Sequence, residues 1–269
     1  MNIIVIAQPY QTSFKIITNC ERLTRILKLK YGKYLLFSDQ HTEKDIIAIK
    51  KNNLYYITFE ENTIRNKSGI LTIDDIIFHN TQYNCNIFAI HGAAVEWQKK
   101  AYLFVASTTS GKSTLTSYLT NMGFGYITDD CILLDRQTFK IYPHTTPIHL
   151  RDEGLKILTQ YKSIHENLET IEDKEIKRHV YTPQNCINES VSLGKIFFIN
   201  RTNAKNYLMD MTTTQRIIAL MKAPITPYSI TPEYLAFLSE LSNKDCKELY
   251  YCDMNFVAEN IKNESNTIK

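Results

Sequence analysis

One eight-residue segment constrains the fold of this chain more than any other. Residues 106–113 read ASTTSGKS, which has the spacing of a phosphate-binding P-loop and ends in Gly-Lys-Ser. An apolar run precedes it at residues 101–105, and a run of helical character follows it at residues 114–119. In a strand–loop–helix unit of this kind, backbone N–H groups converge at the helix N-terminus, where the helix dipole favours negative charge. The segment therefore predicts an α/β fold with an anion-binding loop.

The side chains around this loop indicate what the anion would be. Lys112 can reach β- and γ-phosphates, and the Ser113 hydroxyl can ligate Mg²⁺. A second apolar stretch ends in the acidic pair Asp129-Asp130, and a carboxylate at the end of a neighbouring strand completes a metal site of this type. We therefore expect ATP, or another nucleoside triphosphate, and Mg²⁺ as cofactors. The expected nucleotide contacts are Ser107, Thr108, Thr109, Ser110, Gly111, Lys112, Ser113 and Thr114.

The loop departs from the usual pattern at two positions. Ala106 stands where the pattern has glycine, and Thr109 lies in a loop that is usually glycine-rich because such positions need backbone freedom. The alternative interpretation is a Ser/Thr-rich loop that only caps an ordinary helix. The flanking strand, the following helix and the downstream Asp pair together favour nucleotide binding.

Composition excludes several other classes of function. With 269 residues, 43% hydrophobic and 22% charged, the chain is typical of a soluble protein of one or two domains. A net charge of +3 without a basic stripe argues against nucleic acid and membrane partners, and no apolar run approaches the ~20 residues of a membrane span. The N-terminus lacks a basic leader, and the six cysteines form no Cys-x-x-Cys pair, so we expect a cytoplasmic protein with reduced thiols.

The pattern along the chain predicts two regions. Residues 1–84 read as a β-rich region, with apolar or alternating runs at 2–7, 34–38, 54–59 and 69–73 and a short helix at 20–30. Residues 85–269 read as the P-loop domain with a helical C-terminal tail.

Within the second region several elements are expected. The apolar runs predict a hairpin of 131–135 with 139–142 and a strand at 195–201, whereas residues 159–185 read as a polar, solvated segment. Helices are expected at 212–221, 233–241 and 245–251, and residues 260–269 are expected to fray.

Three motifs occur in a fixed order: residues 91–97 (HGAAVEW), the loop 106–114, and residues 128–130 (TDD). This set resembles the catalytic domain of HPr kinase/phosphorylase, and more closely the HPr-kinase-like kinases found beside lasso-peptide biosynthesis genes, over roughly residues 86–200. The resemblance implies a P-loop kinase core of the HPr kinase/phosphoenolpyruvate carboxykinase-like type, built on a mixed β-sheet. The N-terminal 84 residues do not look like the regulatory domain of HPr kinase/phosphorylase, so control of sugar uptake through HPr is not expected.

The resemblance also implies roles for individual residues. Asp129 would be the base towards the acceptor hydroxyl and Asp130 the metal-side carboxylate, with their order left open, while Lys112 would bind phosphate and Ser113 Mg²⁺. His91 would lie near the transferred phosphoryl group. A further cation is expected to contact phosphate, and the candidates are Arg151, Lys177, Arg178 and Arg201.

The favoured hypothesis is an ATP- and Mg²⁺-dependent serine kinase that acts on a peptide or small protein, including a lasso-type precursor peptide. The alternatives are a kinase of a small hydroxylated metabolite and a nucleotide-binding regulator without transferase activity. The sequence leaves open the acceptor, the nucleotide preference, a reverse phosphorylase reaction and assembly into a homo-oligomer.

Overall fold

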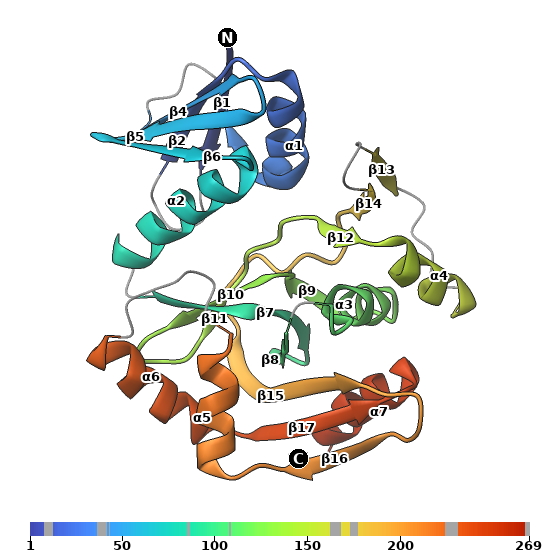
Figure 1. The fold of residues 1–269 in the computed structure, drawn as a ribbon. Helices are drawn as coiled ribbons and strands as arrows, with labels where there is room; N and C mark the ends of the chain where they lie inside the picture. The colour runs from blue at the N-terminus through green and yellow to red at the C-terminus, as the bar shows by residue number, and fades with distance from the viewer. Residues whose placement is uncertain are drawn as a thin grey trace. The chain divides into compact units, whose positions relative to one another are not determined.

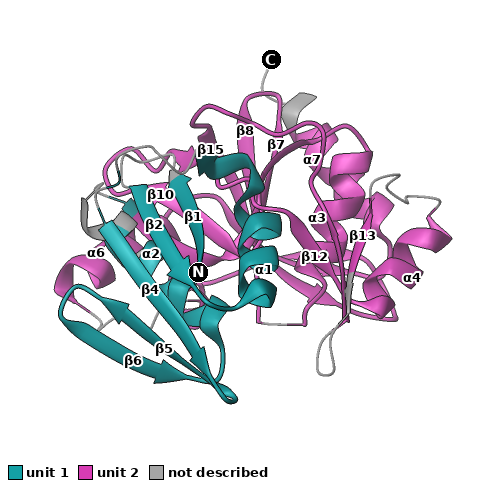
Figure 2. Ribbon diagram, turned by 90° about the horizontal axis from the view of Figure 1, so that it is seen from above, with its two compact units in different colours: residues 1–87 teal, residues 88–269 magenta. Residues whose placement is uncertain are grey.

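The computed structural model describes residues 1–7, 13–36, 42, 44–84, 87–107, 109–161, 168–172, 177–223 and 231–266. The chain forms two compact units, residues 1–87 and residues 88–269, which Figure 2 colours teal and magenta. Each unit has its own hydrophobic core, and all of the candidate site residues belong to the second.

The first unit is a six-stranded sheet with two helices among its described residues (Figure 1). The sheet has the order β3-β1-β2-β4-β5-β6, in which β2 and β4 are parallel and the other pairs antiparallel. Every second residue of β2 is buried, and helix residues such as Leu27 and Ile77 pack in the same core. The elements are β1 (Asn2–Ala7), β2 (Ser13–Thr18), α1 (Glu21–Tyr31), the 3₁₀ turn η1 (Gly32–Tyr34), β3 (Leu35–Leu36), β4 (Lys44–Lys51), β5 (Leu54–Phe59), β6 (Asn62–Asn66) and α2 (Gly69–Asn84).

The second unit is built on a mixed sheet, for which the described residues supply eight strands in the order β11-β10-β7-β8-β15-β17-β16, with β9 paired to β7. β8 runs parallel to β15, and β15 parallel to β17. Because parallel strands end at the same edge of a sheet, the residues that follow these three strands lie together there. The strands are β7 (Ile87–Trp97), β8 (Lys100–Val105), β9 (Gly125–Thr128), β10 (Cys131–Asp135), β11 (Ile141–Tyr142), β15 (Ser192–Arg201), β16 (Tyr207–Asp210) and β17 (Cys246–Tyr251).

Helices cover both faces of this sheet, so its central strands are buried on both sides (Figure 1). Tyr102 and Phe104 of β8 belong to the cluster that also contains residues of α3 (Lys112–Asn121), α4 (Asp152–Gln160) and α7 (Met254–Asn266). Leu103 and Val105 belong to the opposite cluster, with residues of α5 (Thr213–Met221) and α6 (Pro232–Ser242). The alternation explains why β8 reads as a continuous apolar run.

A small antiparallel sheet lies beside α3 and α4 and carries candidate cations. It has the order β12-β14-β13, with β12 (Ile148–Leu150), β13 (Glu169–Glu172) and β14 (Lys177–Tyr181). Tyr181 fixes it to α3, because its buried hydroxyl donates a hydrogen bond to Ser117 Oγ at 2.6 Å. The described part of the polar segment 159–185 is therefore partly ordered as strands.

Most elements expected around the P-loop are confirmed, and three expectations are wrong. Residues 69–73 begin helix α2, in which Ile73 and Ile77 lie one turn apart on the core side. Residues 246–251 form the strand β17. This strand pairs with β15 on one side and with β16 on the other, and that pairing outweighs local helix propensity. Residues 260–266, which were expected to fray, continue helix α7 and bury Ile261 in the core, whereas residues 267–269 lie outside the described residues.

No helix within the described ranges combines the length and the apolar character needed to cross a bilayer.

Gly92 on β7 offers a test of how closely this sheet is packed. A methyl group at this position would lie 2.5 Å from Ile132 Cδ1 and 2.8 Å from the main-chain oxygen of Phe104. We therefore expect Gly92→Ala to lower the free energy of unfolding by about 1–3 kcal/mol, the cost typical of overpacking. Gly32→Ala is the control, because nothing lies within 4 Å of its added methyl group. Equal effects of the two substitutions on urea-induced unfolding would contradict this packing.

Candidate active site

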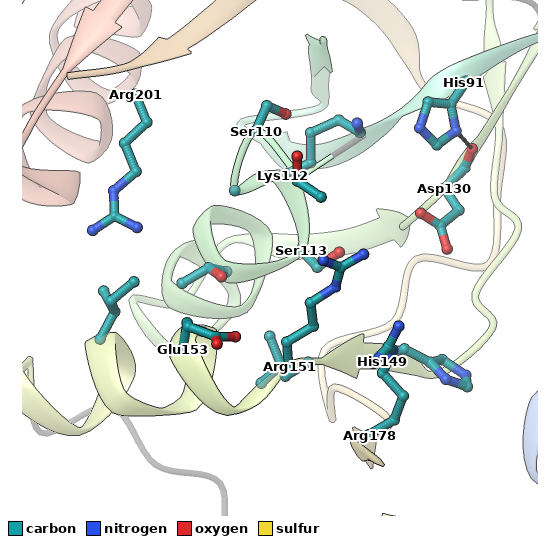
Figure 3. Close-up of a pocket in the computed structure, with 16 residues that line it drawn as sticks. His91, Ser110, Lys112, Ser113, Asp130, His149, Arg151, Glu153, Arg178 and Arg201 are labelled. Carbon is teal, nitrogen blue, oxygen red and sulfur yellow. Dashed lines mark hydrogen bonds between the residues drawn. The ribbon is translucent and has the colours of Figure 1, made fainter. Parts of the chain in front are cut away.

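A pocket of about 430 Å³ lies at the sheet edge where β8, β15 and β17 end. Figure 3 shows His91 and Asp130 on one side of it and Arg201 on the other, with Lys112, Ser113 and Arg151 between them. Its volume is that of a typical small-ligand site. The lining residues are His91, Thr109, Ser110, Gly111, Lys112, Ser113, Thr114, Asp130, His149, Leu150, Arg151, Glu153, Gly154, Ile157, Arg178 and Arg201.

The loop 106–113 has the local structure that its sequence predicts. Gly111 takes the left-handed backbone conformation, with a φ of 91°, and caps the N-terminus of α3. Lys112 is buried, and its ammonium group donates hydrogen bonds to the carbonyls of Ala106 at 3.0 Å and Ser107 at 2.9 Å. Burial lowers the pKa of Lys112, and the carboxylates of Asp130 and Asp129 oppose that shift. A positive charge is thus held inside the loop.

The two loop positions at which the usual pattern has glycine differ in backbone conformation. Thr109 adopts a φ of 68°, a conformation that is strained for a β-branched residue, so the chain accepts at this position the geometry that glycine would adopt freely. Ala106 is absent from the residues with positive φ within the described ranges and packs against the core. Thr108, one of the expected nucleotide contacts, lies outside the described residues.

Ser110 has a buried hydroxyl that suits an anionic ligand. Its hydroxyl oxygen is buried, and within the described part of the chain it has no hydrogen-bond partner. Buried polar groups are normally hydrogen-bonded, and an orphan at the mouth of a helix N-terminus fits an anion that is not part of the protein.

The adjacent aspartates lie in the bend between β9 and β10 and differ in environment. Asp129 is only 3% exposed, accepts a hydrogen bond from the Ser113 side chain, and keeps Oδ1 without a partner among the described residues. Burial, followed by the neighbouring carboxylate of Asp130, raises the pKa of Asp129 to about 8. Asp130 is exposed to the pocket and takes a φ of 75°. The end of the strand therefore separates one buried acid from one accessible acid.

His91 on β7 lies beside this bend. Its Nδ1 is 3.1 Å from the main-chain oxygen of Asp130, and since a carbonyl can only accept, Nδ1 must carry the proton. In the neutral ring Nε2 is then an acceptor, and this buried atom has no hydrogen-bond partner among the residues described. Burial lowers the pKa of His91, as does the positive charge of Lys112, while Asp130 opposes the shift.

Three of the four candidate cations line the pocket, and one does not. Arg151, Arg178 and Arg201 contribute to its wall from the start of α4, from β14 and from the end of β15. Lys177 instead pairs with Asp152 at 3.3 Å and lines a separate pocket. With Lys112, four formal positive charges face the negative charges of Asp130 and Glu153, a balance that favours a polyanionic ligand.

Sequence reasoning missed Glu153 and Ile157, which line the pocket from α4. The sequence feature that could have placed α4 at the pocket is Gly154. A methyl group at this position would lie 2.7 Å from Thr114 Oγ1, so glycine allows α4 to pack this closely on α3. A smaller pocket of about 70 Å³ adjoins the first and shares Gly111, Thr114, Ile157 and Arg201 with it. Tyr161 and Tyr251 also line this smaller pocket.

Comparisons with known proteins add little to this geometry. No family model matches the sequence, and no curated protein matches it. Among solved structures, the chain is similar to the Hpr(Ser) kinase/phosphatase from Coxiella burnetii, with 11% identity over 67% of this chain and 97% of that chain and a TM-score of 0.34. A likeness at that TM-score carries no conclusion about activity, which must rest on the site itself.

The strain at Thr109 can be measured. We expect Thr109→Gly to raise the free energy of unfolding by about 1 kcal/mol, because glycine adopts this φ without the steric cost of a side chain. Ser107→Gly, in the same loop but at a position without positive φ, should have no stabilising effect. If Thr109→Gly destabilises the protein as much as Ser107→Gly does in urea unfolding, the loop is not strained at Thr109.

The buried carboxyl of Asp129 makes stability depend on pH. Because its pKa in the folded protein, about 8, lies above that in the unfolded chain, this carboxyl favours folding at low pH, and that contribution is lost as pH rises through about 8. As pH rises from 5 to 9, the stability of Asp129→Asn relative to the unmodified protein should therefore increase, on the order of a few kcal/mol. A stability difference that is the same at both pH values in urea unfolding would contradict the assigned burial.

Proposed function

We propose that this protein is an ATP- and Mg²⁺-dependent kinase that transfers the γ-phosphoryl group to a serine hydroxyl of a peptide or small protein. The observation that carries the proposal is the buried ammonium of Lys112 inside a P-loop whose next residue, Ser113, is hydrogen-bonded to the buried Asp129. A loop that only capped a helix would have no reason to bury a lysine, an orphan hydroxyl and an acid together.

The residues present fit both the nucleotide and the metal. The backbone amides of the loop and the ammonium of Lys112 suit the phosphates, and the buried Ser110 hydroxyl supplies a further contact. Mg²⁺ prefers oxygen ligands and commonly takes one or two from the protein and others from phosphate, which matches the Ser113 hydroxyl and the orphan oxygen of Asp129. Mg²⁺ bound there would neutralise charge on the phosphates during transfer.

The two aspartates have the environments needed for a division of roles, in the opposite order to the one expected from the sequence. Asp129 is enclosed and adjoins Ser113, so we assign it to the metal side. Asp130 reaches the open pocket, so we assign it as the base. The acceptor oxygen bonds to the γ-phosphorus, the bond from that phosphorus to the β–γ bridging oxygen breaks, ADP leaves, and the hydroxyl proton passes to Asp130.

Arginines support this step and orient the ligand. In Figure 3 the guanidinium group of Arg151 lies beside Ser113, a position suited to the transferred phosphoryl group, and Arg201 lies on the side away from Asp130, next to the smaller pocket lined by tyrosines. Fixed positive charges around a transferring phosphoryl group are worth more than in water because they are already in place. The choice of a seryl peptide as acceptor, including a lasso-type precursor, rests on the resemblance of the three sequence motifs.

The experiment separates binding from transfer. The protein is incubated with labelled ATP, Mg²⁺ and a pool of serine-containing peptides, ADP is quantified, and phosphoserine is located by mass spectrometry; nucleotide affinity is measured by titration without peptide. Lys112→Ala should weaken ATP binding at least tenfold, because it removes the buried ammonium group that we propose contacts the phosphates. Asp130→Asn should keep binding within about threefold and lower turnover by about 10²–10⁴.

Lys177→Ala is the matched control, since Lys177 lies outside the pocket, and it should change neither quantity. If Lys112→Ala bound ATP as tightly as the unmodified protein, the proposed nucleotide site would be refuted. Binding without any phosphorylated product in the unmodified protein would instead favour the nucleotide-binding regulator, and full turnover by Asp130→Asn would refute its assignment as base.

A further inference from the structure

The bend that carries Asp130 is held by the neighbouring strand β7 through one side chain and one main-chain N–H. The pairing of β7 with β9 reaches Ala94 and Thr128, after which β9 ends. Gly92 and His91 lie just before Ala94 in β7. The Gly92 nitrogen lies 3.4 Å from the main-chain oxygen of Asp130, and His91 Nδ1 lies 3.1 Å from the same oxygen. One carbonyl thus accepts two hydrogen bonds from the residues that precede Ala94.

The contacts hold Asp130 in a conformation that few residues other than glycine adopt, although Asp and Asn visit it more often than most. Asp130 has a φ of 75°, in the left-handed region, whereas only glycine visits that region freely. Figure 3 shows the consequence: the main-chain oxygen of Asp130 faces His91, while its carboxylate extends towards Ser113 and Arg151. The two hydrogen bonds on this oxygen hold the main chain of Asp130, from which the carboxylate extends, next to β7.

We propose that His91 is a positioning residue, whose Nδ1–H holds the main chain of Asp130 so that the carboxylate stays directed into the pocket. This inference rests on the proposed function, because it assigns to His91 the alignment of the base in that reaction. Gly92 supplies the second hydrogen bond, and the close packing of Gly92 against Phe104 keeps β7 near enough for both.

The two ring nitrogens can be tested separately. Asparagine places an amide donor near the position of Nδ1, and glutamine places one near the position of Nε2. With the seryl peptide pool, His91→Ala should lower kcat at least tenfold and change KM for ATP less than threefold. His91→Asn should recover most of that loss, and His91→Gln should behave like the alanine variant. Recovery by glutamine but not asparagine, or full activity of His91→Ala, would overturn the proposal.

A second measurement needs no nucleotide. Neutral histidine in water prefers the tautomer protonated at Nε2, whereas this geometry requires the proton at Nδ1. Long-range ¹H–¹⁵N spectra at pH 8 should show the Nδ1–H tautomer for His91, with its signals identified by their loss in His91→Asn. An Nε2–H tautomer would overturn the inference even in an active kinase. An inactive protein with the Nδ1–H tautomer would refute the proposed function and leave the hydrogen bond established.

Discussion

The hydrogen bonds from the buried Lys112 ammonium to the carbonyls of Ala106 and Ser107 are the interaction around which the site is built. Burying an unpaired ammonium is costly, and here two main-chain oxygens accept its hydrogen bonds. The loop can turn this way because β8 ends beside β15, and because Gly111 and Thr109 both accept positive φ. The remaining lining residues surround a charge that the fold already holds in place.

The charged residues reach this point from separate parts of the chain. The small sheet β12-β14-β13 contributes Arg178, the start of α4 contributes Arg151, and the parallel strand β15 contributes Arg201. These elements share a core with α3, so the cations are attached to rigid structure. Preorganised charge of this kind is what phosphoryl transfer demands, because the reaction needs positioning and neutralisation more than covalent help.

Local sequence signals predicted the part of the site that is local in sequence. The strand β8, the turn at Gly111 and the helix α3 were readable because strand periodicity, glycine placement and the Lys-Ser pair fall within one short segment. The strand β17 could not be predicted, because the secondary structure of residues 246–251 depends on pairing with β15 and β16, which are distant in the sequence. Equally, the sequence could not separate Lys177, held by Asp152, from Arg178, its neighbour on β14 that faces the pocket. The φ of 75° at Asp130 was not readable either, because no composition rule encodes a backbone angle.

The most direct test is a crystal structure with Mg²⁺ and a non-hydrolysable ATP analogue. The phosphates should lie against the loop, with Lys112 Nζ moved from the carbonyls of Ala106 and Ser107 to phosphate oxygens, and with the terminal phosphate on the side of His91 and Asp130. An analogue bound elsewhere, while Lys112 still contacts both carbonyls, would contradict the nucleotide site on which the proposed kinase depends.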